Sequence, residues 1–153
     1  MSIETRLGEL GIELPEVPKP VAAYVPAVRA GGFVYTAGQL PVIDGKLQYR
    51  GKLGSDLEIE EGYQAARIAA LNCLSAIREE LGDLDQIEQV VKLEGFVNSA
   101  SGFTDQSKVI NGASDLIGEL CGERGAHARV ALGSCELPLD SAVEVVMVVK
   151  IRE

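Results

Sequence analysis

The chain has 153 residues, 46% of them hydrophobic and 24% charged, a composition that suits one globular domain with an aliphatic core. Its net charge of -9 and the lack of any basic run disfavour nucleic acid and anionic membrane surfaces as partners. Three cysteines without a CxxC pair indicate reduced thiols in a cytoplasmic protein, and no apolar run approaches the ~20 residues of a membrane-spanning helix.

The N-terminal part of the chain, residues 1–20, is predicted to be a short helix and a proline-rich connector ahead of a single domain at residues 21–153. Apolar residues fall on one side of Ile3–Leu10, and Gly11 ends that helix. Three prolines punctuate the connector, because proline neither continues a helix nor donates into a strand ladder.

A hairpin is predicted directly after the connector. Its first strand is expected at Ala22–Arg29 and its second at Phe33–Ala37, with Gly31 and Gly32 in the turn. The polar stretch that follows, up to Asp56, contains at best short strands.

Two amphipathic helices separate the remaining strands. Apolar residues recur at steps of three and four over Glu58–Leu81, and again from Thr104 or Asp105, either of which can cap the helix, to Cys121. The strands are expected at Ile87–Val97, Ala126–Glu136 and Ala142–Ile151. The order is therefore β-β-α-β-α-β-β, an α+β fold whose two helices cover one face of a sheet.

The last predicted strand is apolar on both of its faces. One face carries Val143, Val145, Met147 and Val149, and the other carries Val146 and Val148. A strand of this kind is expected to be buried on both sides. Since two helices cover one face only, we expect another subunit to cover the second face.

Two charged residues interrupt the apolar pattern of the last two strands. Glu144 shares a face with Val146, where a carboxylate is costly unless it is paired, hydrated or protonated. If these strands are antiparallel neighbours, Arg129 comes close to Glu144. The pair is then either a structural ion pair or a site in which Arg129 binds a small carboxylate and Glu144 holds water or moves a proton.

The remaining reactive side chains give weaker signals. His127, the single histidine, precedes Arg129 by two residues and shares its side of the strand, either as an ordinary polar residue or as a general acid or base. We expect no metal and no cofactor, because one histidine and dispersed cysteines give no ligand spacing, and the glycines match neither a GxGxxG motif nor a P-loop. Cys73 and Cys121 are interpreted as packing residues, and Cys135 as a buried strand residue.

Two motifs and one helical residue carry a resemblance to a known family. The N-terminal motif is Tyr24-Val25-Pro26-Ala27-Val28 followed by Tyr35-Thr36-Ala37-Gly38-Gln39-Leu40-Pro41. The C-terminal motif is Ala128-Arg129 followed by Leu137-Pro138 and Val143-Glu144-Val145, with Asn111 in the second predicted helix. From about Val21 to Ile151 the chain resembles the reactive intermediate deaminase family, also called YjgF-type or L-PSP endoribonuclease-type.

This resemblance implies a chorismate-mutase-like fold and a homotrimer with a central β-barrel and active clefts between subunits. The implied reaction is hydrolysis of reactive enamines and imines, such as 2-aminoacrylate, to 2-keto acids and ammonia, without metal or cofactor. By position in the motifs, Arg129 holds the substrate carboxylate and Glu144 positions the water. Gly38 lines the cleft, Tyr24 closes it and Asn111 supports it.

The chain also departs from the family pattern. Ala37 replaces a usual serine, Ala131 a frequent cysteine and His127 a frequent proline, while the segment 1–19 is longer than usual. These differences imply a pocket of altered preference, with Ala131 and His127 near the substrate. Two alternatives stay open: a non-catalytic trimer that binds small carboxylic acids, and an endoribonuclease, which the acidic charge disfavours.

Overall fold

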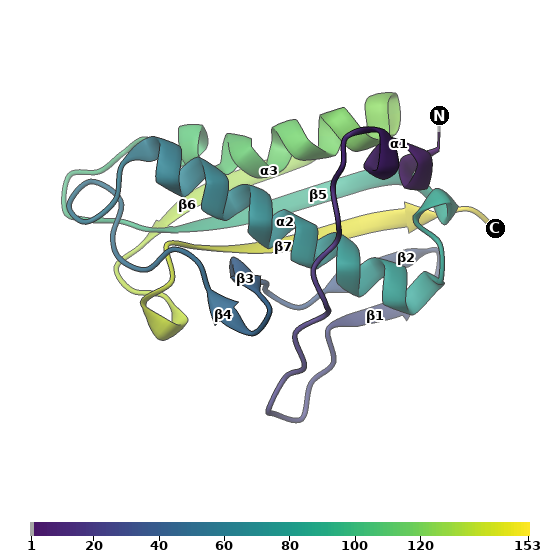
Figure 1. Ribbon diagram of the computed structural model, residues 1–153, viewed down its shortest axis with the longest axis horizontal. Coiled ribbons are helices and arrows are strands. Elements are labelled where there is room, and N and C mark those ends of the chain that lie inside the picture. Colours follow the sequence, from purple (N-terminus) through teal and green to yellow (C-terminus); the bar gives the residue numbers. More distant parts are fainter. Residues whose placement is uncertain (1) are drawn as a thin grey trace.

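The computed structural model, which describes residues 2–153, has a five-stranded mixed sheet with two long helices side by side on one face (Figure 1). The helices are α1 (Ile3–Glu9), α2 (Ile59–Leu81) and α3 (Gln106–Cys121). The strands are β1 (Ala27–Ala30), β2 (Phe33–Thr36), β3 (Val42–Ile43), β4 (Lys46–Leu47), β5 (Ile87–Asn98), β6 (Ala128–Ser134) and β7 (Val143–Ile151). Short 3-10 helices lie at Leu84–Gln86, Gly122–Gly125 and Pro138–Asp140.

The sheet order is β1-β2-β7-β5-β6, so β7 is central and β6 lies at one edge. β5 and β6 are parallel and are joined by the crossover helix α3, as a parallel pair requires. The other strand pairs of this sheet are antiparallel. These features confirm the predicted α+β class, the order of the main elements and the two helices on one face.

Local sequence explains where the two long helices begin and end. Glu58 and Glu61 form a capping box at the start of α2, and Gly82 ends it with a positive φ of 84°. Asp105 occupies the N-cap position of α3, as predicted, but its side chain makes no capping hydrogen bond. The two helices touch closely because one contact residue, Gly112, has no side chain.

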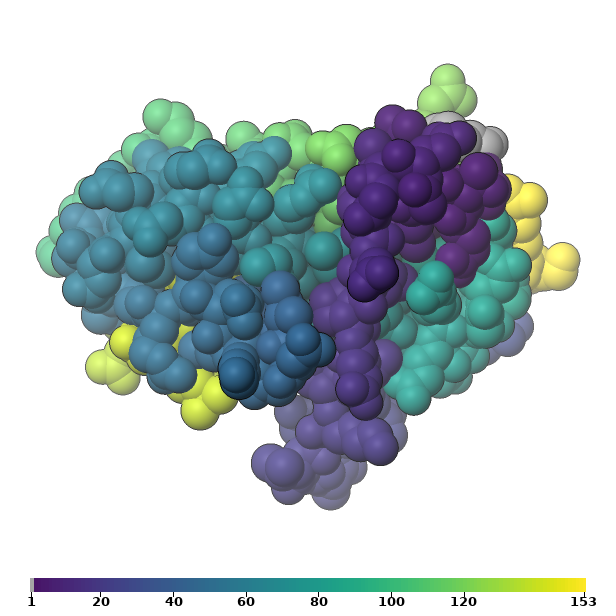
Figure 2. All heavy atoms as spheres, viewed as in Figure 1, coloured from purple at the N-terminus to yellow at the C-terminus, as the bar shows by residue number. Residues whose placement is uncertain are grey.

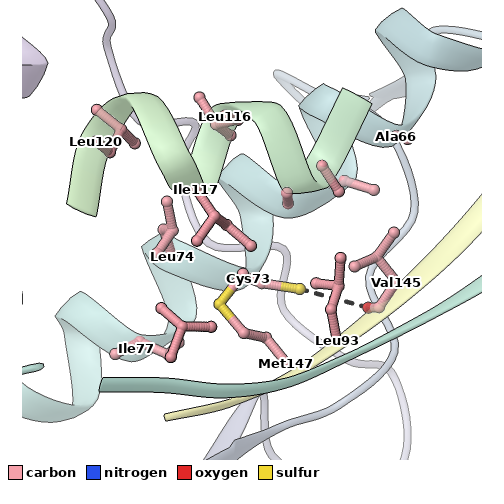
Figure 3. Close-up of a cluster of buried hydrophobic side chains, with 14 of the residues drawn as sticks. Ala66, Cys73, Leu74, Ile77, Leu93, Leu116, Ile117, Leu120, Val145 and Met147 are labelled. Atoms are coloured by element: carbon pink, nitrogen blue, oxygen red, sulfur yellow. Dashed lines mark hydrogen bonds between the residues drawn. The ribbon is translucent and has the colours of Figure 1, made fainter. Parts of the chain in front are cut away.

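Aliphatic side chains fill the space between the helices and the sheet (Figure 3). Ile77 of α2 and Ile117 of α3 lie in one cluster with Leu93 of β5 and Met147 of β7, and Leu74 of α2 extends toward α3. Cys73 and Cys121 are buried in this core, as predicted, and burial raises their thiol pKa values to about 12 and about 11. Cys135, in contrast, is exposed, because β6 ends at Ser134 and leaves it outside the sheet.

The N-terminal segment lies along the surface of the molecule over α2 (Figures 1 and 2). The predicted first helix is present, and Glu4 fixes it to α2 through an ion pair of 2.7 Å with Arg78. The hydrogen bond that Arg78 donates to Glu4 lowers the pKa of the Glu4 carboxyl group. The connector then follows α2, where the Ser75 hydroxyl donates to the carbonyl of Pro15 over 2.8 Å.

The first strand is shorter than predicted, because it begins at Ala27 and not at Ala22. Pro26 lies just before it and has no N–H to give to a ladder, which sets this boundary. Residues 22–25 form no regular element and are exposed. The short strands suspected in the polar stretch are the two-residue hairpin β3–β4.

The face of the sheet opposite the helices is uncovered in the described chain. It exposes apolar side chains, among them Tyr35 at 46% and Leu132 at 50% exposure. A patch of this kind is typical of a subunit contact. None of the helices described has the length and apolar character needed to cross a membrane.

Candidate functional site

Arg129 and Glu144 do not meet within one chain, and the prediction that adjacent strands bring them together is wrong. β5 lies between β6 and β7, because the crossover through α3 places β6 beside β5. Leu93 of β5 pairs with both Arg129 and Met147, so Arg129 points to the face covered by helices. Glu144 pairs with Phe96 and points to the uncovered face.

Arg129 belongs to a group of four polar side chains where α3 passes over β6, which we call the Arg129 cluster: Asn111, Ser114, His127 and Arg129. The Arg129 Nη1 group donates to Asn111 Oδ1 over 2.8 Å and to Ser114 Oγ over 3.2 Å. Asn111 and Ser114 are three residues apart on α3 and therefore share one side of the helix. Asn111, which the family resemblance assigns a supporting role in the cleft, thus hydrogen-bonds Arg129 directly.

The guanidinium of Arg129 keeps part of its binding capacity. Its two bonds use Nη1 alone, and among the described residues neither Nε nor Nη2 has an acceptor and no carboxylate pairs with the group. The side chain is partly exposed. A planar edge of unused N–H donors on an uncompensated cation is suited to a carboxylate with two oxygens.

His127 lies just before β6, which begins at Ala128 and not at the predicted Ala126, and its ring contacts Ser114 as the side chain of Arg129 does. Its Nε2 is 2.9 Å from Ser114 Oγ, and its Nδ1 is 2.6 Å from the carbonyl oxygen of Gly125. Both ring nitrogens are therefore occupied by the protein, which favours a supporting role in the cluster over that of an open acid or base. Ala131, two residues beyond Arg129, packs against the core.

Glu144 forms a second centre on the uncovered face. Burial raises the pKa of its carboxyl group, and among the described residues no hydrogen bond or opposite charge offsets that effect. Gly38 lies against it: a Cβ at Gly38 would be 2.8 Å from Glu144 Oε1. Two backbone hydrogen bonds between Gln39 and Val145, of 2.8 and 2.9 Å, hold this loop beside β7.

A hollow of about 230 Å³ begins at Gly38. Tyr24, which is 58% exposed, lines it together with Gly38. The other lining residues are Pro18, Lys19, Pro20, Val21, Pro26, Gln39, Leu40, Val42 and Leu139. Gly38 thus lies against Glu144 and shares a hollow with Tyr24, while Asn111, His127 and Arg129 gather separately where α3 passes over β6.

Sequence reasoning missed two contributors. Ser114 could have been found from its spacing of three from Asn111 on a predicted helix. Residues 18–21 also line the hollow at Gly38, and nothing in the sequence placed them there. Among the described residues, no three His, Cys, Asp or Glu side chains gather as metal ligands.

Comparison with known proteins gives the family. The family described as YjgF/chorismate mutase-like, "putative endoribonuclease", matches residues 4–151. The chain belongs to this family. Protein TCP17 of Trypanosoma cruzi is 45% identical to it over 151 residues, which cover 98% of this chain and 94% of that protein.

Two solved structures resemble this YjgF-family chain along nearly its whole length. A protein of unknown function from Agrobacterium tumefaciens, Atu1372, is 43% identical, with 98% of this chain and 92% of that chain covered and a TM-score of 0.91. A "putative endoribonuclease" from Shewanella oneidensis is 37% identical, with 99% and 100% covered and a TM-score of 0.95. The resemblance inferred from the two motifs is therefore confirmed, as is the YjgF/chorismate mutase-like fold.

Proposed function

We propose that this chain is a homotrimeric cytoplasmic hydrolase that converts reactive enamines and imines, such as 2-aminoacrylate, to 2-keto acids and ammonia. One observation carries the proposal: among the described residues, Arg129 has no carboxylate partner and the partly buried Glu144 has no hydrogen-bond or cationic partner, and the two side chains point to opposite faces of one sheet. Two such groups can serve one substrate only when a neighbouring copy supplies the second.

The uncovered sheet face supports this arrangement. Exposed Val28, Tyr35 and Leu132 lie on strands whose apolar side chains a second and third copy would bury. β6 is an edge strand, so Arg129 lies at the margin of its subunit. A threefold axis that closes the sheets into a barrel can set this margin against the Glu144 face of the next subunit.

The chemistry follows from the two groups. The free edge of Arg129 binds the substrate carboxylate, and Glu144 accepts a proton from the water that attacks the imine carbon. An enamine first takes a proton from solvent at carbon and becomes the iminium form of the imine. After water has added, Glu144 returns its proton to nitrogen. The C–N bond then breaks while the new hydroxyl group releases its proton to solvent, and ammonia and a keto acid leave. The raised pKa of Glu144 makes it a stronger base than an exposed glutamate.

The first test measures ammonia release from 2-aminoacrylate generated in the assay and from imines of several amino acids. Arg129→Ala is expected to lower kcat/KM about 100-fold or more, since it removes a charged contact to the substrate. Arg129→Lys keeps the charge without the planar pair of donors, so its kcat/KM should lie between those of wild type and Arg129→Ala. No ammonia from any imine in the panel, with folded trimeric protein, would refute the proposal.

The second test asks whether the site lies between subunits. Arg129→Ala and Glu144→Gln are each expected to be nearly inactive. The two variants are unfolded, mixed in equal amounts and refolded together. Each site then has an even chance of receiving an intact Arg129 from one subunit and an even chance of receiving an intact Glu144 from the next. About one site in four should therefore recover. Mixtures that stay inactive would place both groups of a site in the same chain.

The same assays separate the alternatives. Tight binding of a keto acid without turnover would identify a binding protein. Cleavage of RNA by rigorously purified protein, lost in Arg129→Ala, would instead identify an endoribonuclease, the activity in the family's description.

A further inference from the structure

The hydrogen bonds of the Arg129 cluster form a chain whose donors and acceptors can be assigned. The carbonyl oxygen of Gly125 can only accept, so His127 Nδ1, 2.6 Å away, carries a proton. Arg129 can only donate, so Ser114 Oγ accepts from its Nη1. In neutral His127 the other nitrogen, Nε2, is then a bare acceptor, and the Ser114 hydroxyl donates to it over 2.9 Å.

We propose that Ser114 and His127 are positioning residues for Arg129, and that the neutral Nδ1–H form of His127 sets the donor-to-acceptor direction of these hydrogen bonds. This inference rests on the proposed function, because it takes carboxylate binding by Arg129 as the role that the hydrogen bonds serve. Neither residue is expected to touch the substrate. Each acts through the orientation of the guanidinium.

The geometry explains how the chain acts. Asn111 and Ser114 are held by α3, while His127 lies just before β6, so three side chains from two parts of the chain fix the Arg129 guanidinium. Both Nη1 hydrogens are engaged, and this leaves the Nε and Nη2 edge for a ligand. A free arginine side chain has many rotamers, and fixing it before binding spares part of the entropy lost when the ligand arrives.

A purely structural role predicts a different result. Partly exposed hydrogen bonds contribute modestly to folding, so a structural link between α3 and β6 would change the melting temperature and leave ligand affinity alone. A positioning role predicts the reverse: a small change in stability and a clear change in KM, with kcat nearly constant once the substrate is bound.

Four substitutions test the chain in matched pairs. Ser114→Ala removes the link and should raise KM and the dissociation constant for pyruvate about tenfold, with kcat within about twofold of wild type. Ser114→Thr keeps the hydroxyl and should restore wild-type values. For His127→Gln, the amide can reach the Nε2 position and accept from Ser114, so binding should be nearly normal. His127→Asn can replace only the Nδ1 donor, and its KM should rise about threefold.

The tautomer has a direct spectroscopic signature. His127 is the single histidine of the chain, so its two ring-nitrogen signals need no assignment to a residue and have only to be told apart as Nδ1 and Nε2. At pH 8 we expect a protonated Nδ1 and a bare Nε2 in the ¹⁵N spectrum, with the Nε2 signal moved in Ser114→Ala.

The results of these variants can be separated from the results that test the proposed hydrolase. An active wild type with KM unchanged in Ser114→Ala, or a protonated Nε2 at pH 8, overturns the positioning role while the hydrolase stands. Pyruvate binding without ammonia release refutes the hydrolase, and the binding series then decides the positioning role. A wild type that neither binds pyruvate nor releases ammonia refutes both.

Discussion

The contact between α2 and α3 gives a sharp test of the packing that carries the Arg129 cluster. A Cβ added at Gly112 of α3 would lie 2.8 Å from the carbonyl carbon of Tyr63 in α2, and closer still to its oxygen. Real Cβ atoms keep at least 3.0 Å from such atoms. A backbone carbonyl inside a helix cannot turn away, so the methyl group must push the two helices apart.

The same helix contains a matched control. A Cβ at Gly118 would meet nothing within 4 Å. Gly112→Ala is expected to lower the free energy of unfolding by about 3 kcal/mol, the upper end for overpacking a core. Gly118→Ala should raise it by about 0.5–1 kcal/mol, because alanine loses less backbone entropy in a helix.

Urea denaturation followed by circular dichroism measures both changes. At about 2–4 °C per kcal/mol, Gly112→Ala should melt about 10 °C below wild type. Since Asn111 adjoins Gly112 in the chain, the remaining folded protein should also bind pyruvate less tightly. If Gly112→Ala proves as stable as Gly118→Ala, the helices do not approach as closely as described, and the placement of the cluster fails with them.

Three further outcomes are expected. Gly38→Ala should displace the Glu144 carboxylate and lower kcat about tenfold or more while the melting temperature stays nearly constant, because only a flexible side-chain end must move. Burial raises the pKa of Glu144, so the folded state holds that proton more tightly than the unfolded state, and stability falls as pH rises through the folded pKa. Glu144→Gln should therefore melt higher than wild type at pH 7, with the gap closing toward pH 4.5, the ordinary value for this group; an equal gap at both pH values contradicts this. A maleimide should label Cys135 in the native protein, and Cys73 and Cys121 only after denaturation; three labelled thiols in native protein would refute the burial of the latter two.

Periodicity and capping predicted the elements whose signals are local. The apolar spacing of Glu58–Leu81 placed α2 within one residue of its observed start, and Gly82 marked its end. The alternation in the last strand predicted one face under the helices and one that needs a partner. The predicted start of the first strand at Ala22 is wrong, because the residues before Pro26 have strand propensity but make no ladder hydrogen bonds.

The relation between Arg129 and Glu144 lay beyond local reasoning. Consecutive strands in a sequence are often neighbours in a sheet, but here the crossover through α3 makes β6 a partner of β5. Because β6 is next to β5 and not to β7, Arg129 and Glu144 point to opposite faces of the sheet. Ser114 was missed for a related reason, since its partners come from a strand that the helix covers only after folding.

The opposed orientation of the two groups has a consequence for the cell. A newly synthesised chain that folds alone would possess every side chain of the proposed site and no working copy of it. Activity would then rise more steeply than in proportion to the amount of protein, so that low expression leaves the chain dormant. In the proposed trimer, dilution below the concentration that holds the subunits together would abolish the proposed activity without unfolding the chain.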